Sequence, residues 1–384
     1  MKKVLIYYRY FGRTLGGGEY LPLAFAAELQ KECAVTLALD WTDNVELASE
    51  KLGVPLDFSR LSVVQAMPPG FHATTNGPLL SVRRFRRLRQ LAADADVCIS
   101  LANLMDFGKP AHHFLITIGL GDPAFDDYVA RRSPSLPVRA KRAAGSLLRP
   151  LLGMRSKRSL LADPRQRLYP NSRYAARLIE DFYGPFSGQV FYPPTLFEPA
   201  PASDTARNPF RVVYLGRVSP AKRILDIVDI VEKARALSGA PLELRLAGRL
   251  DESPFKTRLL RLAADRPWLA IDGELYGREK EDFLLSATYA IHAMRTEAFG
   301  ISVTEYLKAG LLPLVPDDGG SREVVDNPAL TYHSNDEAAR LLARLPADPA
   351  FREAQRRRCT ERARLFSRDA YLERQRQVLR AILA

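Results

Sequence analysis

Cysteine is scarce in this sequence, and its distribution argues against two common kinds of scaffold. The three cysteines lie far apart, at Cys33, Cys98 and Cys359. An odd and sparse set gives neither a disulfide framework nor a metal-binding pair, and it is typical of a reducing compartment. Long apolar runs are missing too, since no stretch reaches the roughly 18 residues of a membrane-spanning helix. We therefore expect a cytoplasmic protein.

The first residues, MKKVLIYY, have the basic start of a secretory signal. Their apolar stretch is far too short for one, and Arg9 ends it at once. We interpret this segment as a first buried strand.

Familiar binding fingerprints are also absent. The sequence has no G-x-G-x-x-G motif followed by an acid about twenty residues later, which argues against an NAD-dependent oxidoreductase. It has no recognised nucleic-acid-binding module, and no repeat of solenoid length.

The chain is long and apolar enough to form two globular domains. It contains 384 residues, of which 47% are hydrophobic and 26% are charged. At roughly 100–200 residues per domain, this length predicts two domains, each with a sizeable core.

The net charge of +12 is concentrated in one segment. Twelve Arg or Lys residues and a single acid, Asp163, lie between Arg131 and Arg173. Such a surface suits a nucleic acid, an anionic membrane or a phosphorylated substrate, and a plain solvated face is equally open. Leucines mixed with cations over residues 138–161 are typical of an interfacial segment, although Pro150 breaks any single long helix. Docking onto the inner face of an anionic membrane is therefore one hypothesis.

Strand-like runs alternate with helical patterns in the first half of the chain. We expect strands at Val4–Tyr8, Ala34–Leu39, Val97–Ser100 and Phe114–Ile118. The clearest helical pattern covers residues 81–94, where apolar side chains recur every three positions. The five arginines between Arg83 and Arg89 would form its solvated face.

A segment with five prolines, residues 193–209, has the composition of a linker. The alternation then restarts, with a helix through Ile224–Ala236 and strands at Arg211–Gly216, Leu242–Gly248, Thr288–Met294 and Leu311–Pro316. This pattern predicts an α/β protein with two doubly wound domains, residues 1–195 and 208–366. Ligands of such sheets bind at the carboxyl ends of the strands, so two facing sheets would share one cleft.

Two glycine-containing loops follow predicted strands. Gly17 and Gly18 belong to a glycine triplet whose backbone would approach a ligand closely, or which forms a plain turn. In the second half, Gly216 is followed by Arg217 and Lys222, five residues apart. These two cations could reach the phosphates of a nucleoside diphosphate and stabilise its charge as it leaves.

The most informative segment runs from Glu297 to Glu305. A tight turn at Phe299 and Gly300 begins a helix whose first N–H groups, including that of Ile301, could face a phosphate or sugar hydroxyls. Both carboxylates could accept hydrogen bonds from a sugar. The alternative is a solvated helix, but charge is unusual where Glu297 lies, between a buried strand and a turn.

These segments resemble a known family. GRVSPAKR, EAFGISVTE and DGGSREVV look like the donor-binding signature of retaining glycosyltransferase family 4, with its E-x7-E motif at Glu297 and Glu305. HAMRTEAFGISVTEYLKAGLLPLV, together with GGGE, is most similar to mannosyltransferases of lipid-linked oligosaccharide assembly. The resemblance is weak over residues 40–165 and strong over 167–325. It implies the GT-B architecture, with a last helix at about 367–384 that returns to the acceptor-binding first domain.

The resemblance also implies a role for each motif residue. Arg217 and Lys222 would bind the diphosphate, Glu305 the ribose and Glu297 the transferred sugar. The remaining donor contacts would come from Gly17, Gly18, Gly216, Phe299, Gly300 and Ile301.

The reaction implied is transfer of a hexose from GDP-mannose or a UDP-hexose, without a metal or other cofactor, to a glycan or lipid-linked acceptor. Polysaccharide and lipopolysaccharide assembly use such steps. The anomeric configuration would be retained by a front-face mechanism, in which the protein contributes positioning and electrostatic stabilisation.

One position departs from the family. Many relatives have a histidine that touches the donor sugar where this chain has Gly121. Asp122 could replace it as a sugar or acceptor contact, whereas His113 lies too early and is expected to be structural. Two alternatives stay open: a catalytically silent sugar-nucleotide-binding protein, and a GT-B epimerase or phosphorylase.

Overall fold

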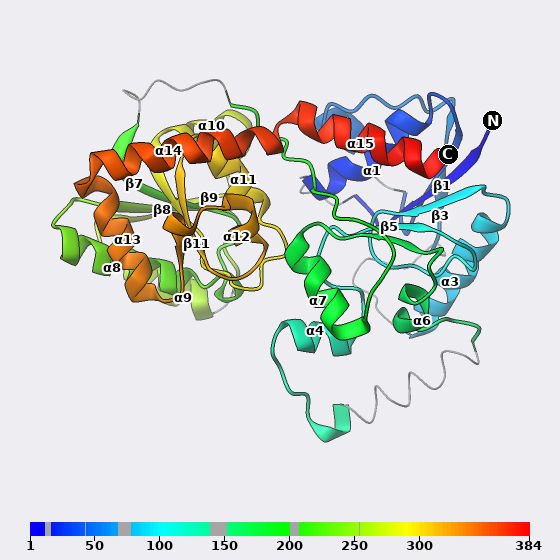
Figure 1. Cartoon of the computed structure of the whole chain (residues 1–384), viewed down its shortest axis with the longest axis horizontal. Helices are drawn as coiled ribbons and strands as arrows, with labels where there is room; N and C mark the ends of the chain where they lie inside the picture. Colours follow the sequence, from blue (N-terminus) through cyan, green and yellow to red (C-terminus); the bar gives the residue numbers. More distant parts are fainter. Residues whose placement is uncertain (12–16, 43, 68–77, 139–151, 200–206, 253) are drawn as a thin grey trace. The chain divides into compact units, whose positions relative to one another are not determined.

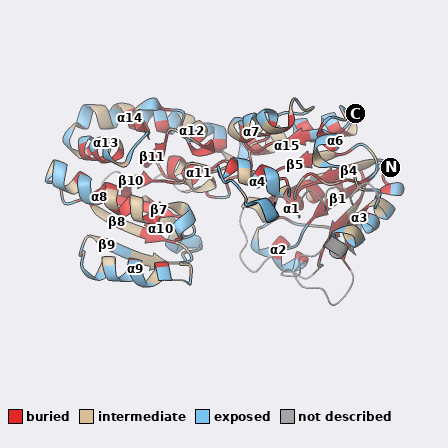
Figure 2. Ribbon diagram, turned by 90° about the horizontal axis from the view of Figure 1, so that it is seen from below, coloured by how far each residue is buried: buried red, intermediate tan, exposed pale blue. Residues whose placement is uncertain are grey.

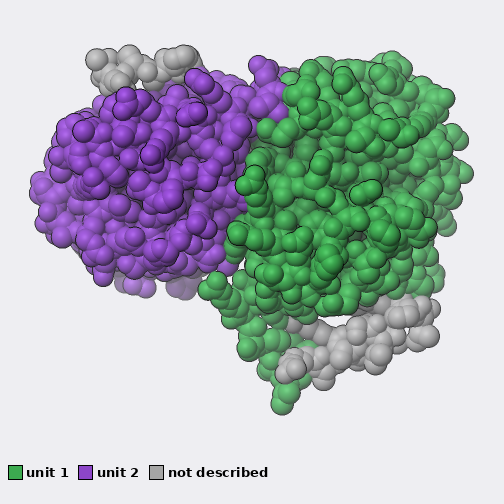
Figure 3. Space-filling model, in the orientation of Figure 1, with its two compact units in different colours: residues 1–194, 371–384 green, residues 195–370 purple. Residues whose placement is uncertain are grey.

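The computed structural model describes residues 1–11, 17–42, 44–67, 78–138, 152–199, 207–252 and 254–384. The chain divides into two compact units (Figure 3). Unit 1 comprises Met1–Pro194 and Tyr371–Ala384, and unit 2 comprises Thr195–Ala370. In each unit a parallel sheet is packed between helices (Figure 1).

The sheet of unit 1 has six strands in the order β3-β2-β1-β4-β5-β6. Its strands are β1 (Lys3–Tyr8), β2 (Ala34–Leu39), β3 (Leu61–Gln65), β4 (Val97–Ser100), β5 (His112–Phe114) and β6 (Arg167–Tyr169). Its named helices are α1 (Gly17–Leu29), α2 (Val45–Lys51), α3 (Pro78–Ala93), α4 (Pro123–Val129), α6 (Lys157–Leu161) and α7 (Arg173–Tyr183). The strand order reverses direction between β1 and β4, which makes their carboxyl ends the expected place for a ligand.

The last helix, α15 (Arg368–Leu383), contributes most of its length to unit 1. Tyr371, Val378 and Ile382 lie in the core formed with α1 and β1. The Gln375 side chain donates a hydrogen bond to the carbonyl of Ala24 in α1 (2.8 Å). Hydrophobic burial therefore fixes this helix on unit 1.

The sheet of unit 2 also has six strands, in the order β12-β11-β10-β7-β8-β9. They are β7 (Asn208–Leu215), β8 (Glu243–Ala247), β9 (Leu269–Gly273), β10 (Ala287–Ile291), β11 (Leu312–Pro316) and β12 (Thr331–Tyr332). The α-helices are α8 (Ile224–Ser238), α9 (Pro254–Ala264), α10 (Gly277–Leu285), α11 (Ile301–Lys308), α12 (Gly320–Val325), α13 (Asn335–Ala347) and α14 (Pro349–Ala363). The strands β10 and β11 are buried along their whole length, while the helices expose their outer faces (Figure 2).

The structure corrects one predicted strand. We expected Phe114–Ile118, whereas β5 is His112–Phe114 and pairs with β4 and β6 over these few residues. Beyond it, the carbonyl of Ile116 accepts a hydrogen bond from the Asn171 side chain (2.9 Å). The N–H of Leu115 still donates to the carbonyl of Tyr169 (3.0 Å), but at Ile116 a side chain takes the place of a ladder partner. Four further strands, β3, β6, β9 and β12, were not predicted. β6 and β12 have only three and two residues, and β3 and β9 interrupt their apolar residues with polar ones.

The arginines of α3 are a second correction. Arg84 is 17% exposed and its Nε donates to Asp40 (2.9 Å), and Arg89 pairs with Asp106 (3.1 Å). Arg83, Arg86 and Arg87 are exposed, as expected. Only part of the run is therefore a solvated face, because the helix turns two guanidinium groups toward carboxylates of unit 1.

Candidate active site

The candidate site lies at the carboxyl edge of the unit 2 sheet. β10 pairs in parallel with β7 on one side and with β11 on the other. The loops that leave these three strands carry the motif residues predicted from sequence, at residues 216–223, 292–300 and 317–320. Parallel pairing therefore brings together segments that are far apart in the chain.

The loop after β7 begins with a constrained turn at Gly216. Its φ is +147°, and a Cβ there would lie 3.0 Å from the Tyr214 hydroxyl. That hydroxyl donates to the carbonyl of Arg217 (2.9 Å), and the Tyr306 hydroxyl accepts from the N–H of Leu215 (2.7 Å). Two buried tyrosines thus hold the loop that carries the predicted phosphate ligands. Arg217 itself is exposed, which leaves its guanidinium accessible to an anion.

Lys222 and Glu297 form the central ion pair of the site. Lys222 ends a short 3-10 turn, Pro220–Lys222, and its Nζ donates to Oε2 of Glu297. The two side chains are 25% and 18% exposed. A cation from the β7 loop and a carboxylate from the β10 loop therefore meet at one partly open point.

His292 completes this cluster, and sequence reasoning missed it. It follows β10 directly, is 2% exposed, and places Nε2 3.4 Å from Oε2 of Glu297. Burial alone would raise the pKa of Glu297, but His292 and Lys222 outweigh it and lower the pKa to about 2. Glu297 is therefore ionised at neutral pH. A histidine directly after a fully apolar strand was the signal that could have revealed it.

Glu305 lies on α11 and is 8% exposed. Lys280 of α10 donates to its Oε1 (2.9 Å), and Lys280 also lies 5.5 Å from the centre of the Phe197 ring. The second carboxylate of the E-x7-E motif is thus oriented by a lysine that the sequence analysis did not consider. Its role toward a ribose stays a prediction.

The turn before α11 is fixed by backbone packing. Gly300 has φ +97° and precedes Ile301, the first residue of α11, while Phe299 is buried. The N–H of Gly320 donates to the carbonyl of Glu297 (2.7 Å), so the start of α12 holds this turn. A Cβ at Gly320 would lie only 2.1 Å from the carbonyl oxygen of Ala298.

Several buried polar atoms near this edge have no hydrogen-bond partner among the described residues. They are the hydroxyls of Ser219 and Ser321 and the Nδ1 atom of His292. Buried polar groups are almost always satisfied in folded proteins. These orphaned groups therefore favour a polar ligand at this edge of the sheet.

The predicted residues of unit 1 have less informative surroundings. Gly17 and Gly18 begin α1, and a Cβ at Gly18 would lie 3.2 Å from Ile116. Asp122 caps α4 through the N–H of Ala124 (3.0 Å) and accepts a hydrogen bond from the Tyr183 hydroxyl (2.7 Å). Its predicted role as an acceptor contact remains open beside this structural one.

His113 is fully buried in β5, as expected of a structural residue. Its Nε2 pairs with the Gln166 side chain (2.8 Å), and its Nδ1 accepts from the N–H of Met105 (3.4 Å). Burial lowers its pKa to about 4, so the ring is neutral at neutral pH.

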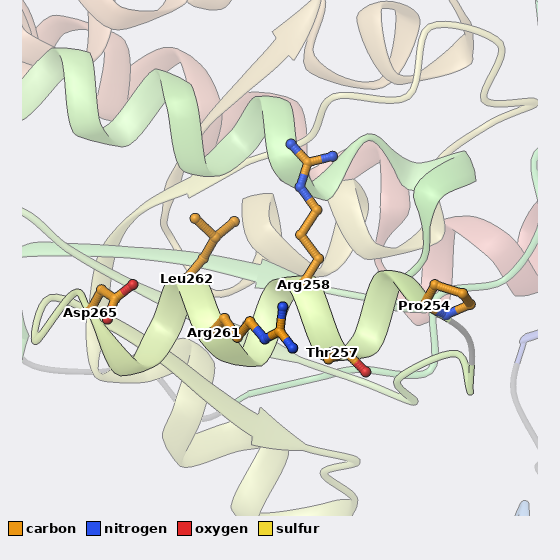
Figure 4. A pocket seen from close by; sticks show the side chains of 6 residues that line it. All are labelled: Pro254, Thr257, Arg258, Arg261, Leu262 and Asp265. Atoms are coloured by element: carbon orange, nitrogen blue, oxygen red, sulfur yellow. The ribbon is translucent and has the colours of Figure 1, made fainter.

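A hollow of about 630 Å³ lies elsewhere, along α9 (Figure 4). Its lining comes from this helix and the residue after it: Pro254, Thr257, Arg258, Arg261, Leu262 and Asp265. None of the motif residues contributes to it, so it is not the candidate site.

Two other kinds of feature are missing from the described ranges. No three His, Cys, Asp or Glu side chains in them are arranged to hold a metal ion. None of the helices seen there is both long enough and apolar enough to cross a bilayer.

Comparison with known proteins gives three kinds of match. Residues 200–366 match the family model described as glycosyl transferases group 1. A GDP-Man:Man(3)GlcNAc(2)-PP-Dol alpha-1,2-mannosyltransferase of Yarrowia lipolytica is 30% identical over 153 residues, covering 35% of this chain and 24% of that protein. The chain therefore spans about a quarter of the length of this curated relative.

Solved structures match over the whole chain. Anabaena HepE in complex with UDP and glucose has a TM-score of 0.68 and 15% identity, covering 100% of this chain and 99% of that one. Sucrose-phosphate synthase from Thermosynechococcus elongatus has a TM-score of 0.69 and 14% identity, with the same coverage. WaaG, a glycosyltransferase involved in lipopolysaccharide biosynthesis, has a TM-score of 0.64 and 12% identity, covering 98% of both chains. At these identities the likeness concerns the fold, and it confirms the predicted GT-B architecture. This chain thus has the GT-B fold, and residues 200–366 of its second half match the glycosyl transferases group 1 model.

Proposed function

We propose that this protein is a retaining glycosyltransferase of family 4. It transfers a hexose of mannose or glucose type from a nucleoside-diphosphate sugar to a glycan or lipid-linked acceptor, and it needs no metal ion. The observation that carries this proposal is the Lys222–Glu297–His292 cluster at the carboxyl edge of the unit 2 sheet. The domain match, the UDP-glucose complex of HepE and the GDP-mannose in the name of the fungal relative support a nucleotide-sugar donor.

In the proposed reaction, Arg217 and Lys222 bind the diphosphate and stabilise the charge that it gains as it leaves. The bond between the anomeric carbon and the phosphate oxygen breaks, and the acceptor oxygen bonds to the same face of that carbon. The acceptor proton passes to the leaving phosphate. Glu297, ionised because of its low pKa, accepts hydrogen bonds from the sugar hydroxyls throughout.

The donor is identified by a thermal-shift and calorimetric screen of UDP, GDP, ADP and their sugar conjugates. We expect one nucleotide to bind and, at 100 times its Kd, to stabilise the protein by about 2.7 kcal/mol. Glu305→Ala should weaken the binding of that nucleotide, because the variant removes the carboxylate proposed to hold the ribose. Glu279→Gln, an exposed acid on α10, is the matched control.

The outcomes of this screen separate the candidate functions. If none of the nucleotides or their sugar conjugates binds, the proposal is contradicted. Binding without transfer to any acceptor would favour a silent binding protein. Turnover of the sugar nucleotide that needs phosphate, or that only inverts one of its centres, would favour a phosphorylase or an epimerase.

Peripheral membrane association through residues 131–173 is a second part of the proposal, because a lipid-linked acceptor lies in a bilayer. Residues 139–151 of this segment lie outside the described part of the chain. Some described cations bind within unit 1: Arg155 pairs with Asp106 and Asp163, and Arg158 donates to two carbonyls of α7. Any membrane contact therefore depends on the remaining cations.

Flotation with vesicles that contain anionic lipid measures this association. We expect binding at low salt that is lost at high salt, because charge attraction is screened. Replacing four cations by glutamine (Arg139, Lys141, Arg142 and Arg149) should lower the partition coefficient by roughly a thousandfold, at about 1 kcal/mol per charge. The control replaces the exposed Arg86 and Arg87 of α3 in the same way. Failure of the wild-type protein to float at low salt would rule out the membrane part of the proposal.

A further inference from the structure

A second cluster of polar and aromatic side chains lies at the carboxyl edge of the unit 1 sheet. β1 and β2 pair in parallel along their whole length and end together at Tyr8 and Leu39. Two residues follow each strand: Arg9 and Tyr10 after β1, and Asp40 and Trp41 after β2. The N–H of Asp40 donates to the carbonyl of Arg9 (2.6 Å), which joins the two loops.

Asp40 is the centre of this cluster, and its side chain is 0% exposed. Its Oδ1 accepts hydrogen bonds from the Tyr7 hydroxyl (3.0 Å) and from Nε of Arg84 (2.9 Å). Nε of Arg9 approaches Oδ2 at 3.8 Å, beyond hydrogen-bond distance. Oδ2 has no hydrogen-bond partner in the described part of the chain. Burial raises the pKa of Asp40, and its three neighbours offset this only in part.

The charges of the cluster do not cancel. Two guanidinium groups, of Arg9 and Arg84, face one carboxylate, which leaves one positive charge. The Arg9 side chain is 44% exposed and the Arg84 side chain 17%. Asp40 holds the Arg84 guanidinium through a hydrogen bond and attracts the more exposed Arg9 at longer range. The remaining donors of the two guanidinium groups suit recognition of a phosphate.

Two aromatic rings lie beside these arginines. The rings of Tyr10 and Trp41 meet edge to face, with centroids 5.6 Å apart, and Arg9 lies 5.9 Å from the centre of the Tyr10 ring. Tyr10 is 37% exposed, so part of its ring is accessible to a ligand. Aromatic faces pack well against the C–H face of a pyranose ring, because both surfaces are apolar and flat.

We propose that Arg9, Tyr10, Trp41 and Arg84, held by Asp40, form the acceptor subsite and take a sugar that carries a phosphate or diphosphate group. The aromatic rings bind the sugar, and the two guanidinium groups bind the phosphate. The site lies at the carboxyl edge of the sheet, after β1 and β2, and so beside the position between β1 and β4 at which the strand order reverses. This inference rests on the proposed transferase function, since only a transferase needs an acceptor beside its donor.

The test is a ligand-observed NMR titration of the full-length protein with mannose 1-phosphate, mannose and inorganic phosphate. The donor site is first saturated with the nucleoside diphosphate found in the screen, so that the sugar phosphate cannot bind there. We expect the sugar phosphate to bind at least tenfold more tightly than either mannose or inorganic phosphate. Arg84→Gln and Trp41→Ala should each lower the affinity for the sugar phosphate by about tenfold to a hundredfold. The first variant loses a hydrogen bond to a charged group, and the second loses a stacked ring.

Arg87→Gln is the matched control, because Arg87 is exposed on the same helix. If Arg84→Gln fails to fold because the buried Asp40 loses its partner, Trp41→Ala still tests the inference. Nucleotide binding should be unchanged in all three variants, which separates this subsite from the donor site. Equal binding of inorganic phosphate and sugar phosphate, or unchanged binding by both Arg84→Gln and Trp41→Ala, would overturn the inference. If no nucleotide binds, the titration is run without one. Sugar-phosphate binding that depends on Trp41 would then establish a sugar-phosphate site here, although its role as an acceptor subsite would have failed with the transferase function.

Discussion

Glu297→Ala is expected to lower kcat by about a hundredfold to a thousandfold, the loss typical of removing one preorganised polar group at a reacting centre. The substitution removes the hydrogen-bond acceptor of the sugar and leaves Lys222 and His292 without their shared carboxylate. Because the pKa of Glu297 is held at about 2, the wild-type protein keeps this negative charge at neutral pH. Transfer of radiolabelled sugar to an acceptor measures the effect.

The effect of Glu297→Ala on nucleotide affinity, compared with its effect on kcat, shows whether Glu297 contributes to donor binding or to transfer. We expect the affinity for the nucleoside diphosphate to change less than tenfold, since Lys222 is freed to bind phosphate. Glu297→Gln, which keeps the shape and removes the charge, should lie between wild type and alanine, and Glu279→Gln should behave as wild type. A kcat within threefold of wild type for Glu297→Ala would show that this carboxylate does not contribute to transfer.

Gly320→Ala is expected to destabilise unit 2 by about 3 kcal/mol or more, the upper end of the cost of overpacking. The backbone conformation of Gly320 is open to any residue, so the cost comes from contact alone. Its Cβ would lie 2.1 Å from the carbonyl oxygen of Ala298 and 2.7 Å from Cα of Phe299. Both are backbone atoms of the turn that carries Glu297, and they cannot move without displacing it.

Urea unfolding followed by tryptophan fluorescence measures this loss for unit 2 alone. The sequence has two tryptophans, and in a Trp41→Phe background the signal comes from Trp268, which lies in unit 2. Gly239→Ala is the control in the same unit: no atom lies within 4 Å of its Cβ, and only its φ of +64° is unfavourable. That strain costs about 1 kcal/mol. A loss for Gly320→Ala no larger than for Gly239→Ala would contradict the packing argument.

Local sequence patterns were sufficient for most of the fold. The strands at Val4–Tyr8, Ala34–Leu39 and Val97–Ser100 were expected, and the structure has β1, β2 and β4 within one residue of these positions. Buried parallel strands are recognisable because they are continuous apolar runs between helical patterns. Short strands such as β6 and β12 were not predicted, because segments of three and two residues are too short to show a periodicity.

The sequence alone indicated the chemistry that lies within a few residues: Arg217 with Lys222 on one loop, and Glu297 with Glu305 across one turn and helix. Only the tertiary structure decided which side chains surround them. Lys222 and Glu297 are 75 positions apart, Lys280 and Glu305 are 25 apart, and Arg84 lies 44 positions from Asp40. Such pairs form because parallel strands bring the ends of distant segments to one edge of a sheet, and this pairing order is not written in any local pattern of residues.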